Sequence, residues 1–117
     1  MNYSLNQFLA FKKKLRPNTE VQILSGSMEP WIKTGETVLV SPCRPEELSP
    51  YDIIVFYDQK KTKLICHVFI KIVQDKLITK ALENKKLDEP NLKHFLLGKV
   101  TKPKFNWFQK FILRFLF

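Results

Sequence analysis

The sequence is poor in several residue types on which particular classes of protein depend. Its 2 cysteines, Cys43 and Cys66, are too few for the disulfide framework of a small secreted domain or for a four-cysteine zinc site. Only 3 glycines are present, which excludes collagen-like and low-complexity material. No apolar run reaches the roughly 18 residues needed to span a bilayer. We interpret both cysteines as structural, and they leave the redox compartment open.

Apolar and basic residues are abundant by contrast. Of 117 residues 44% are hydrophobic and 10 are phenylalanine, which is enough to bury the core of one domain and excludes wholesale disorder. Lys and Arg number 20 against 11 Asp and Glu, so the net charge is +9. A basic surface favours anionic partners such as nucleic acid or anionic lipid, although a solvated basic face explains the same charge.

Residues 1–17 predict a short amphipathic helix. The apolar positions that suit one helical face are Leu5, Phe8, Leu9 and Leu15. The basic cluster at 12–16 follows these apolar residues, whereas a secretory signal has the opposite order, so we expect no cleavable signal. Pro17 ends the helix, because the residue before a proline is disfavoured in helical geometry.

Residues 18–103 predict one mainly β domain. Short runs rich in β-branched residues predict strands at 21–24, 36–40, 52–57, 64–73, 77–80 and 95–100, with loops at 42–50 and 81–93. The polar turn at 58–61 predicts a hairpin between the third and fourth of these strands. The expected fold class is therefore mainly β: an antiparallel sheet with a short N-terminal helix and a C-terminal amphipathic helix.

Alternation along the strand at 64–73 predicts two faces. One face carries Cys66, Val68, Ile70 and Ile72, and the other carries His67, Phe69, Lys71 and Val73. The Cys66 thiol is therefore not expected to share a cleft with His67.

Residues 104–117 predict a second amphipathic helix. Nine of the thirteen residues in 105–117 are apolar, while Asn106, Lys110 and Arg114 fall on one narrow helical stripe. Such a helix is too short to span a bilayer but suits the membrane interface, which predicts peripheral membrane association. The alternative is a helix docked on the core of its own domain.

The segment Ser25-Gly26-Ser27 presents two hydroxyls after a predicted strand, at a turn that Gly26 allows to be tight. A serine nucleophile needs a base, and the sequence has 2 histidines, His67 and His94. We interpret His94 as an ordinary loop or strand-start histidine. Taken alone, a histidine on a strand such as His67 more often has a structural role in the core or on the surface than a catalytic one.

Residues 25–30, Ser-Gly-Ser-Met-Glu-Pro, followed by Gly35-Glu36 and a β-branched strand, resemble the nucleophile box of type I signal peptidases. These peptidases belong to a wider serine peptidase clan that includes LexA-like self-cleaving repressors. Residues 52–56 are similar to the family's Gly-Asp-Ile-Val-Val-Phe strand, with Tyr51 where glycine is usual. Residues 65–72 are similar to the strand that carries the general base, which is Lys in the bacterial branch and His in the archaeal and endoplasmic-reticulum branch. His67 occupies that position, followed by Val68 in place of Arg.

The resemblance continues downstream and covers about residues 20–102. Residues 79–88 are similar to the His branch's Thr-Lys-Gly-Asp-Asn-Asn segment with its trailing Asp pair, and residues 98–100 to its closing Gly-Lys/Arg-Val strand. Departures from the pattern stand at Ala81, Leu82 and Leu87. Asp88 matches the second Asp of the pair.

The resemblance implies a signal-peptidase/LexA-like fold and a serine endopeptidase. Ser27 would attack the scissile carbonyl, His67 would take and return its proton, and Asp88 would orient the imidazole. Lys71, Lys80 or another lysine is the alternative base.

The same resemblance implies how the substrate is held. The Ser27 N–H and the Ser25 hydroxyl would stabilise the oxyanion. Met28 and apolar strand residues would line a cleft in which an extended peptide pairs as an added strand. We expect no metal and no other cofactor.

The expected partner is a protein or peptide with a leader or signal sequence, and nucleic acid is not expected. The peptidase would act at a membrane surface through residues 105–117, or in the cytoplasm. One alternative is a soluble maturation peptidase for a single dedicated partner, as nickel superoxide dismutase maturation proteases in this clan are. Another is a non-enzymatic, repressor-like protein that keeps the fold, although residues 1–17 are too few for a helix-turn-helix domain.

Overall fold

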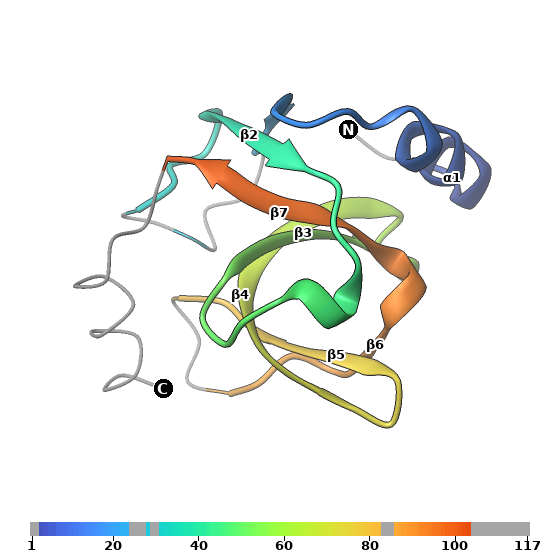
Figure 1. Cartoon of the computed structure of the whole chain (residues 1–117), viewed down its shortest axis with the longest axis vertical. Helices are drawn as coiled ribbons and strands as arrows, with labels where there is room; N and C mark the ends of the chain where they lie inside the picture. Colours follow the sequence, from blue (N-terminus) through green and yellow to red (C-terminus); the bar gives the residue numbers. More distant parts are fainter. Residues whose placement is uncertain (1–2, 24–27, 29–30, 83–85, 104–117) are drawn as a thin grey trace.

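The computed structural model describes residues 3–23, 28, 31–82 and 86–103. These residues form a curled, wholly antiparallel sheet with the strand order β1-β2-β7-β3-β4-β5-β6 (Figure 1). The strands are β1 (Thr19–Gln22), β2 (Thr37–Ser41), β3 (Ile53–Asp58), β4 (Lys63–Val73), β5 (Lys76–Lys80), β6 (Asn91–Leu92) and β7 (Leu96–Lys102). One helix, α1 (Leu5–Lys14), precedes them, and η1 (Pro45–Glu47) and η2 (Lys93–Phe95) are short 3-10 turns. The predicted mainly β fold with a short N-terminal helix is confirmed.

Helix α1 begins at a capping box. Gln7 N–H donates to Ser4 Oγ over 3.1 Å, and Ser4 N–H donates to Gln7 Oε1 over 2.8 Å, which satisfies two otherwise unpaired donors at the helix start. The buried Phe8 ring stacks on Tyr57 of β3 with the ring centroids 4.8 Å apart. Leu9, predicted to lie on the apolar face, is instead 41% exposed. Packing of Phe8 therefore decides which side of α1 faces the sheet.

Two apolar clusters lie on the two faces of the sheet, and β3 contributes to both. Ile53, Val55 and Tyr57 belong to the cluster that α1 covers, together with Cys66 and Val68 of β4. The intervening Ile54 and Phe56 belong to the second cluster. This division follows the two-residue period of a strand. The second cluster also contains Ile65, Phe69, Leu77 and Leu96.

A register shift in β4 changes which side chains share a face. Phe69 pairs with Thr79 of β5, but Lys71 pairs with Ile78, so one extra residue of β4 is accommodated between them. Beyond this irregularity Ile72 packs in the cluster of Phe69, and Lys71 falls on the opposite face from His67. The predictions that Ile72 shares a face with Cys66, and Lys71 with His67, are therefore wrong.

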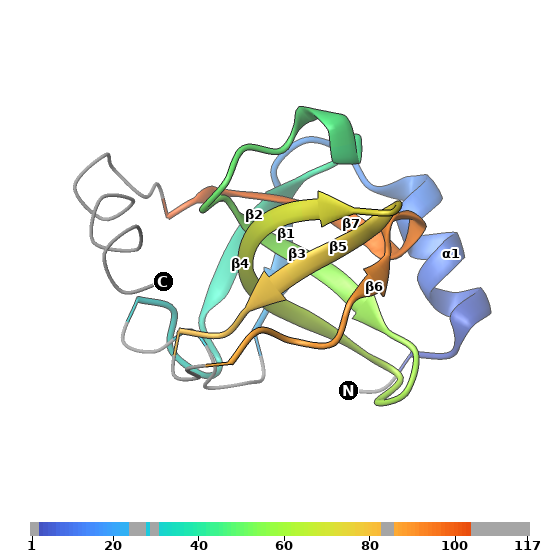
Figure 2. The same ribbon diagram turned by 90° about the horizontal axis from the view of Figure 1, so that it is seen from below.

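The connections also differ from the predicted loops. The β4–β5 turn consists of Gln74 and Asp75, both at positive φ (50° and 63°), as a two-residue hairpin turn of type I′ requires. Strand β6 lies within the predicted loop at 81–93, and Figure 2 shows it beside β5 at the edge of the sheet. A strand of two residues is too short to produce a recognisable alternation. Strand β1 begins two residues earlier than predicted and ends at Gln22.

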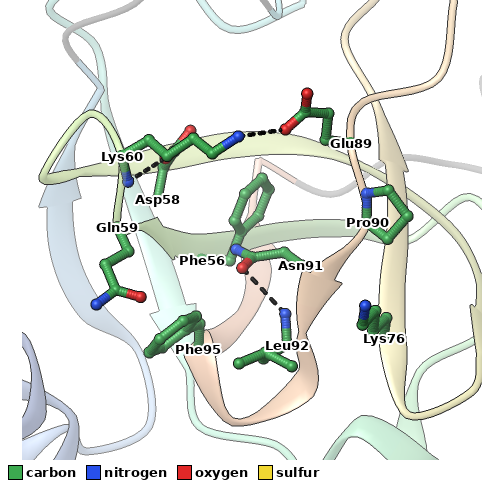
Figure 3. Close-up of a pocket in the computed structure, with 10 residues that line it drawn as sticks. All are labelled: Phe56, Asp58, Gln59, Lys60, Lys76, Glu89, Pro90, Asn91, Leu92 and Phe95. Atoms are coloured by element: carbon green, nitrogen blue, oxygen red, sulfur yellow. Dashed lines mark hydrogen bonds and ion pairs between the residues drawn. The ribbon is translucent and has the colours of Figure 1, made fainter.

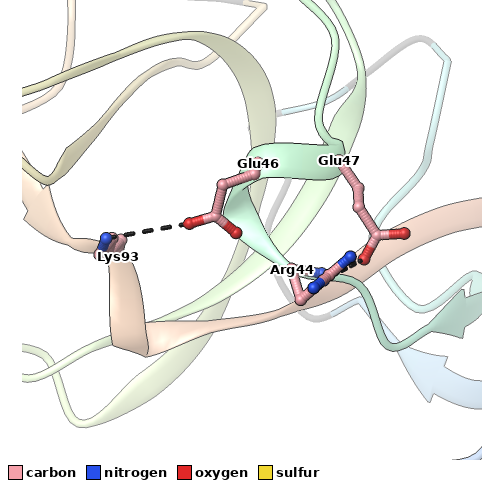
Figure 4. Close-up of polar contacts among 4 residues, drawn as sticks. All are labelled: Arg44, Glu46, Glu47 and Lys93. Carbon is pink, nitrogen blue, oxygen red and sulfur yellow. Dashed lines mark hydrogen bonds and ion pairs between the residues drawn. The ribbon is translucent and has the colours of Figure 1, made fainter.

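The turn η1 interrupts the predicted loop at 42–50. Glu46 lies 3.9 Å from the ammonium of Lys93 in η2, and Arg44 lies 3.4 Å from Glu47 (Figure 4). Exposed ion pairs of this kind contribute little to stability, so these contacts orient the loop rather than support the core.

The predicted C-terminal helix at 104–117 lies outside the described residues. Within the described part of the chain, no helix has the length and apolar character needed to cross a bilayer.

Candidate active site

His67 and Asp88 lie in direct contact on the face of the sheet that carries Phe56. His67 belongs to β4, where it pairs with Ile54 of β3, and Asp88 follows the end of β5. His67 Nδ1 lies 2.5 Å from Asp88 Oδ2. The two side chains are 13% and 23% exposed, so the contact is largely screened from water. Of the three predicted catalytic residues, the structure thus brings together these two.

Thr79 of β5 completes this polar cluster. Its hydroxyl donates to Asp88 Oδ2 over 2.7 Å, and its carbonyl oxygen accepts from the Asp88 N–H over 2.9 Å. Because Thr79 pairs with Phe69, it lies diagonally across from His67 on the same face. Thr79 belongs to the segment 79–88 that resembles the His branch, but the resemblance gives it no role. The β4–β5 register was the signal that would have found it.

Asp88 is electrostatically suited to orient an imidazole. Burial is the largest single influence on the pKa of the Asp88 carboxyl, and it raises that pKa. Hydrogen bonds from His67 and Thr79 and the charge of Lys61 act in the opposite direction and together hold the pKa below its ordinary value. Asp88 is therefore ionised at neutral pH.

The ionisation of Asp88 determines which nitrogen of the neutral His67 ring carries the proton. An ionised carboxylate can only accept hydrogen bonds, so the Nδ1 atom of His67 carries the proton that it shares with Asp88. In a neutral imidazole the other nitrogen, Nε2, then has the free lone pair. A lone pair at Nε2 is what a general base requires.

Residues 86–92, which we term the strap, carry Asp88 and cross beside the β3–β4 hairpin (Figure 3). Glu89 forms a 2.8 Å ion pair with Lys60 of the hairpin turn, and Asn91 Nδ2 donates to the Tyr57 carbonyl over 2.9 Å. These contacts fix the strap on the C-terminal side of Asp88, while Thr79 fixes Asp88 itself.

A cavity of about 340 Å³ lies between the strap and the sheet. Its lining includes Phe56 and Phe95, with Lys60, Lys76 and Glu89 around it (Figure 3). The Phe56 ring also meets the His67 ring edge-on, with the centroids 5.8 Å apart. Phe56 therefore contacts both the cavity and the imidazole, whereas His67 itself is not among the lining residues.

The remaining predicted site residues have different outcomes. Ser25 and Ser27 lie outside the described residues. Met28, expected to line the cleft, has no exposed surface and packs in the cluster of Cys66 and Val68. Its placement is that of a core side chain, with no surface that a substrate could contact.

The alternative bases lie away from the imidazole face. Lys71 is exposed and on the opposite face from His67. Lys80 pairs with Val68, which places it on the other face of β5 from Thr79. Burial lowers the pKa of the Lys80 ammonium, an effect that the negative charge of Asp88 opposes. His94 lies in η2, and its carbonyl oxygen accepts a hydrogen bond from Lys12.

Both cysteines are free thiols. Burial raises the pKa of Cys66 to about 12. Burial, with a smaller contribution from Glu47, raises the pKa of Cys43 to about 11. Both thiols are therefore protonated at neutral pH, which makes them weak nucleophiles.

The cluster of one imidazole, one carboxylate and one hydroxyl can orient a base and transfer a proton. A metal site usually needs three or more protein ligands. Among residues 3–23, 28, 31–82 and 86–103, no group of three His, Cys, Asp or Glu side chains gathers in that way. Comparison of the chain with protein-family models found no match, and comparison with curated proteins found none either.

Proposed function

We propose that this chain is a serine endopeptidase of the type I signal peptidase kind, in its His-base branch. The contact between His67 Nδ1 and Asp88 Oδ2 carries the proposal. Both residues stand at positions that match the family's motifs, and they are 21 positions apart in the sequence. A strand histidine held by a partly buried carboxylate is an arrangement that can activate a serine.

The proposed reaction follows from the roles of these groups. Ser27 Oγ attacks the scissile carbonyl carbon while its proton passes to His67 Nε2, and Asp88 stabilises the resulting imidazolium. The Ser27 N–H and the Ser25 hydroxyl stabilise the oxyanion. The imidazolium then gives its proton to the leaving amine, which leaves an acyl-enzyme. Water, deprotonated by the same imidazole, hydrolyses this ester and restores Ser27.

The proposed substrates are proteins or peptides that carry a leader or signal sequence. Residues 105–117 have the amphipathic and basic pattern of a segment that lies at a membrane surface, so we propose peripheral membrane association. Cleavage sites of signal-type substrates lie just outside the hydrocarbon, and an enzyme held at the interface meets them there. A soluble peptidase that matures one dedicated partner uses the same chemistry.

The test is cleavage of a signal-bearing preprotein and of a panel of leader peptides, with products identified by mass spectrometry. The unaltered chain and His94→Ala, the matched histidine control, should cleave the same bond. Ser27→Ala and His67→Ala should lose on the order of 10³-fold or more in kcat. Ser25→Ala should lose on the order of 10²-fold, as expected for one oxyanion donor. Cleavage that persists in Ser27→Ala or His67→Ala would contradict the proposal.

A further inference from the structure

Thr79 holds Asp88 at two points. Its side-chain hydroxyl donates to Oδ2 of the carboxylate over 2.7 Å, and its carbonyl oxygen accepts the Asp88 N–H over 2.9 Å. The first contact restrains the end of the Asp88 side chain, and the second restrains the main chain from which it projects. Asp88 lies in the strap, outside any regular strand or helix, so the hydrogen bonds of a sheet or helix do not fix its backbone.

The hydroxyl of Thr79 and the ring of His67 bind the same oxygen atom. His67 Nδ1 and Thr79 Oγ1 lie 2.5 and 2.7 Å from Asp88 Oδ2. A carboxylate oxygen has two lone pairs, and here one accepts from the hydroxyl and the other from the imidazole. With one lone pair engaged by Thr79, the remaining lone pair is directed at His67.

Thr79 is itself rigid. It is 1% exposed, lies within β5 and is paired with Phe69 of β4. Its β-branched side chain has few accessible rotamers, and a hydroxyl this deeply buried must keep a hydrogen-bond partner. The position of Oγ1 is thus set by the sheet that also positions His67.

We propose that Thr79 is a positioning residue that holds Asp88 Oδ2 against His67 Nδ1 and so selects the imidazole tautomer whose Nε2 is free to take a proton. The catalytic consequence rests on the proposed peptidase function, whereas the hydrogen-bond relay from β5 through Asp88 to β4 does not. Asp88 touches the base, and Thr79 acts through Asp88.

Removal of the hydroxyl has a predictable electrostatic effect. Burial of Asp88 would still raise its pKa, while one of the hydrogen bonds that lower it would be lost. The other charged groups that act on Asp88 are His67 on β4, Lys61 in the hairpin turn and Lys80 on β5, and all three stay in place. Thr79→Val, which nearly preserves side-chain volume, should therefore raise the pKa of Asp88, because one hydrogen bond that favours the ionised carboxylate is lost.

Nuclear magnetic resonance on the purified full chain tests this relay without any substrate. The carboxyl carbon of Asp88 is titrated with pH, and the ring nitrogens of His67 report the tautomer. Thr79→Val should shift the Asp88 midpoint upward and mix the His67 tautomers, while Thr79→Ser should keep both as in the unaltered chain. Thr101→Val is the matched control. Thr101 lies near the end of β7, and its hydroxyl donates to Asn18 Oδ1 and to the Leu39 carbonyl, so its loss leaves Asp88 untouched.

Activity measurements separate the two proposals. Where the chain cleaves peptides, Thr79→Val should lower kcat about 10- to 100-fold with little change in KM, and Thr79→Ser should restore it. If the Asp88 midpoint shifts in Thr79→Val while neither the unaltered chain nor any variant cleaves a substrate, the positioning role stands and the peptidase proposal fails. An Asp88 midpoint and His67 tautomer unchanged in Thr79→Val would overturn the positioning role. If Thr79→Val does not fold, the Asp88 midpoint and the His67 tautomer are measured in Thr79→Ala, and the same two outcomes decide.

Discussion

Oδ2 of Asp88 lies 2.5 Å from Nδ1 of His67, although the two residues belong to segments separated by a hairpin turn and a whole strand. The antiparallel pairing of β4 with β5 returns the chain past His67 and places Thr79 within reach of it. The strap then places the Asp88 carboxylate in contact with both His67 and Thr79. The contact is thus a product of strand register.

We expect Asp88→Asn to reduce kcat for peptide cleavage on the order of 10⁴-fold, because an amide in this place favours the wrong imidazole tautomer. The matched control is Glu89→Gln, which removes the neighbouring carboxylate. Glu89 is exposed and paired with Lys60, so this variant should cleave at close to the unaltered rate. Comparable activity of Asp88→Asn and Glu89→Gln would show that Asp88 does not orient the base.

The acid stability of the fold should depend on Asp88. Its pKa is lower in the folded chain than in the unfolded chain, so its ionisation stabilises the fold above the unfolded pKa of about 4. This contribution is lost as the pH falls through the lower, folded pKa. Urea denaturation should therefore find Asp88→Asn less stable than the unaltered chain at pH 7, with a difference that narrows towards pH 2. A difference independent of pH would contradict this assignment.

Lys71 should be dispensable for catalysis. The register shift in β4 places Lys71 on the face opposite His67, where its side chain is exposed and cannot replace the imidazole. We expect Lys71→Ala to cleave at the unaltered rate and His67→Ala to be inactive, as measured by initial rates on one leader peptide. The reverse result, with an active His67→Ala and an inactive Lys71→Ala, would establish a lysine base.

Residues 105–117 should bind anionic membranes. Lys110 and Arg114 would face the headgroups, each contributing about 1 kcal/mol near an anionic surface, while the apolar residues enter the acyl boundary. Co-sedimentation with vesicles rich in phosphatidylserine compares the full chain with a chain that ends at Pro103. The full chain should pellet more strongly, less so with zwitterionic lipid, and high salt should release part of it. Equal pelleting of the two forms would contradict the anchor.

The local elements of this fold could be predicted from the sequence. The apolar positions of residues 1–17 and Pro17 predict α1, and two β-branched runs around the polar turn at 58–61 predict the β3–β4 hairpin. Alternation also places His67 and Cys66 on opposite faces, because successive side chains of a strand point in opposite directions. These features depend on neighbours within a few residues, so a single sequence contains the information for them.

Tertiary structure decided the rest. The extra residue of β4 beyond Phe69, which moves Lys71 off the face of His67, arises from how β4 pairs with β5. The short strand β6 exists because Asn91 and Leu92 find partners on β5. The register between β4 and β5 places Thr79 on the face of His67. Its hydroxyl reaches Asp88 because the strap lies over that face. Each of these depends on residues that meet across strands, and hydrophobic periodicity along one strand does not encode where a distant strand will pair.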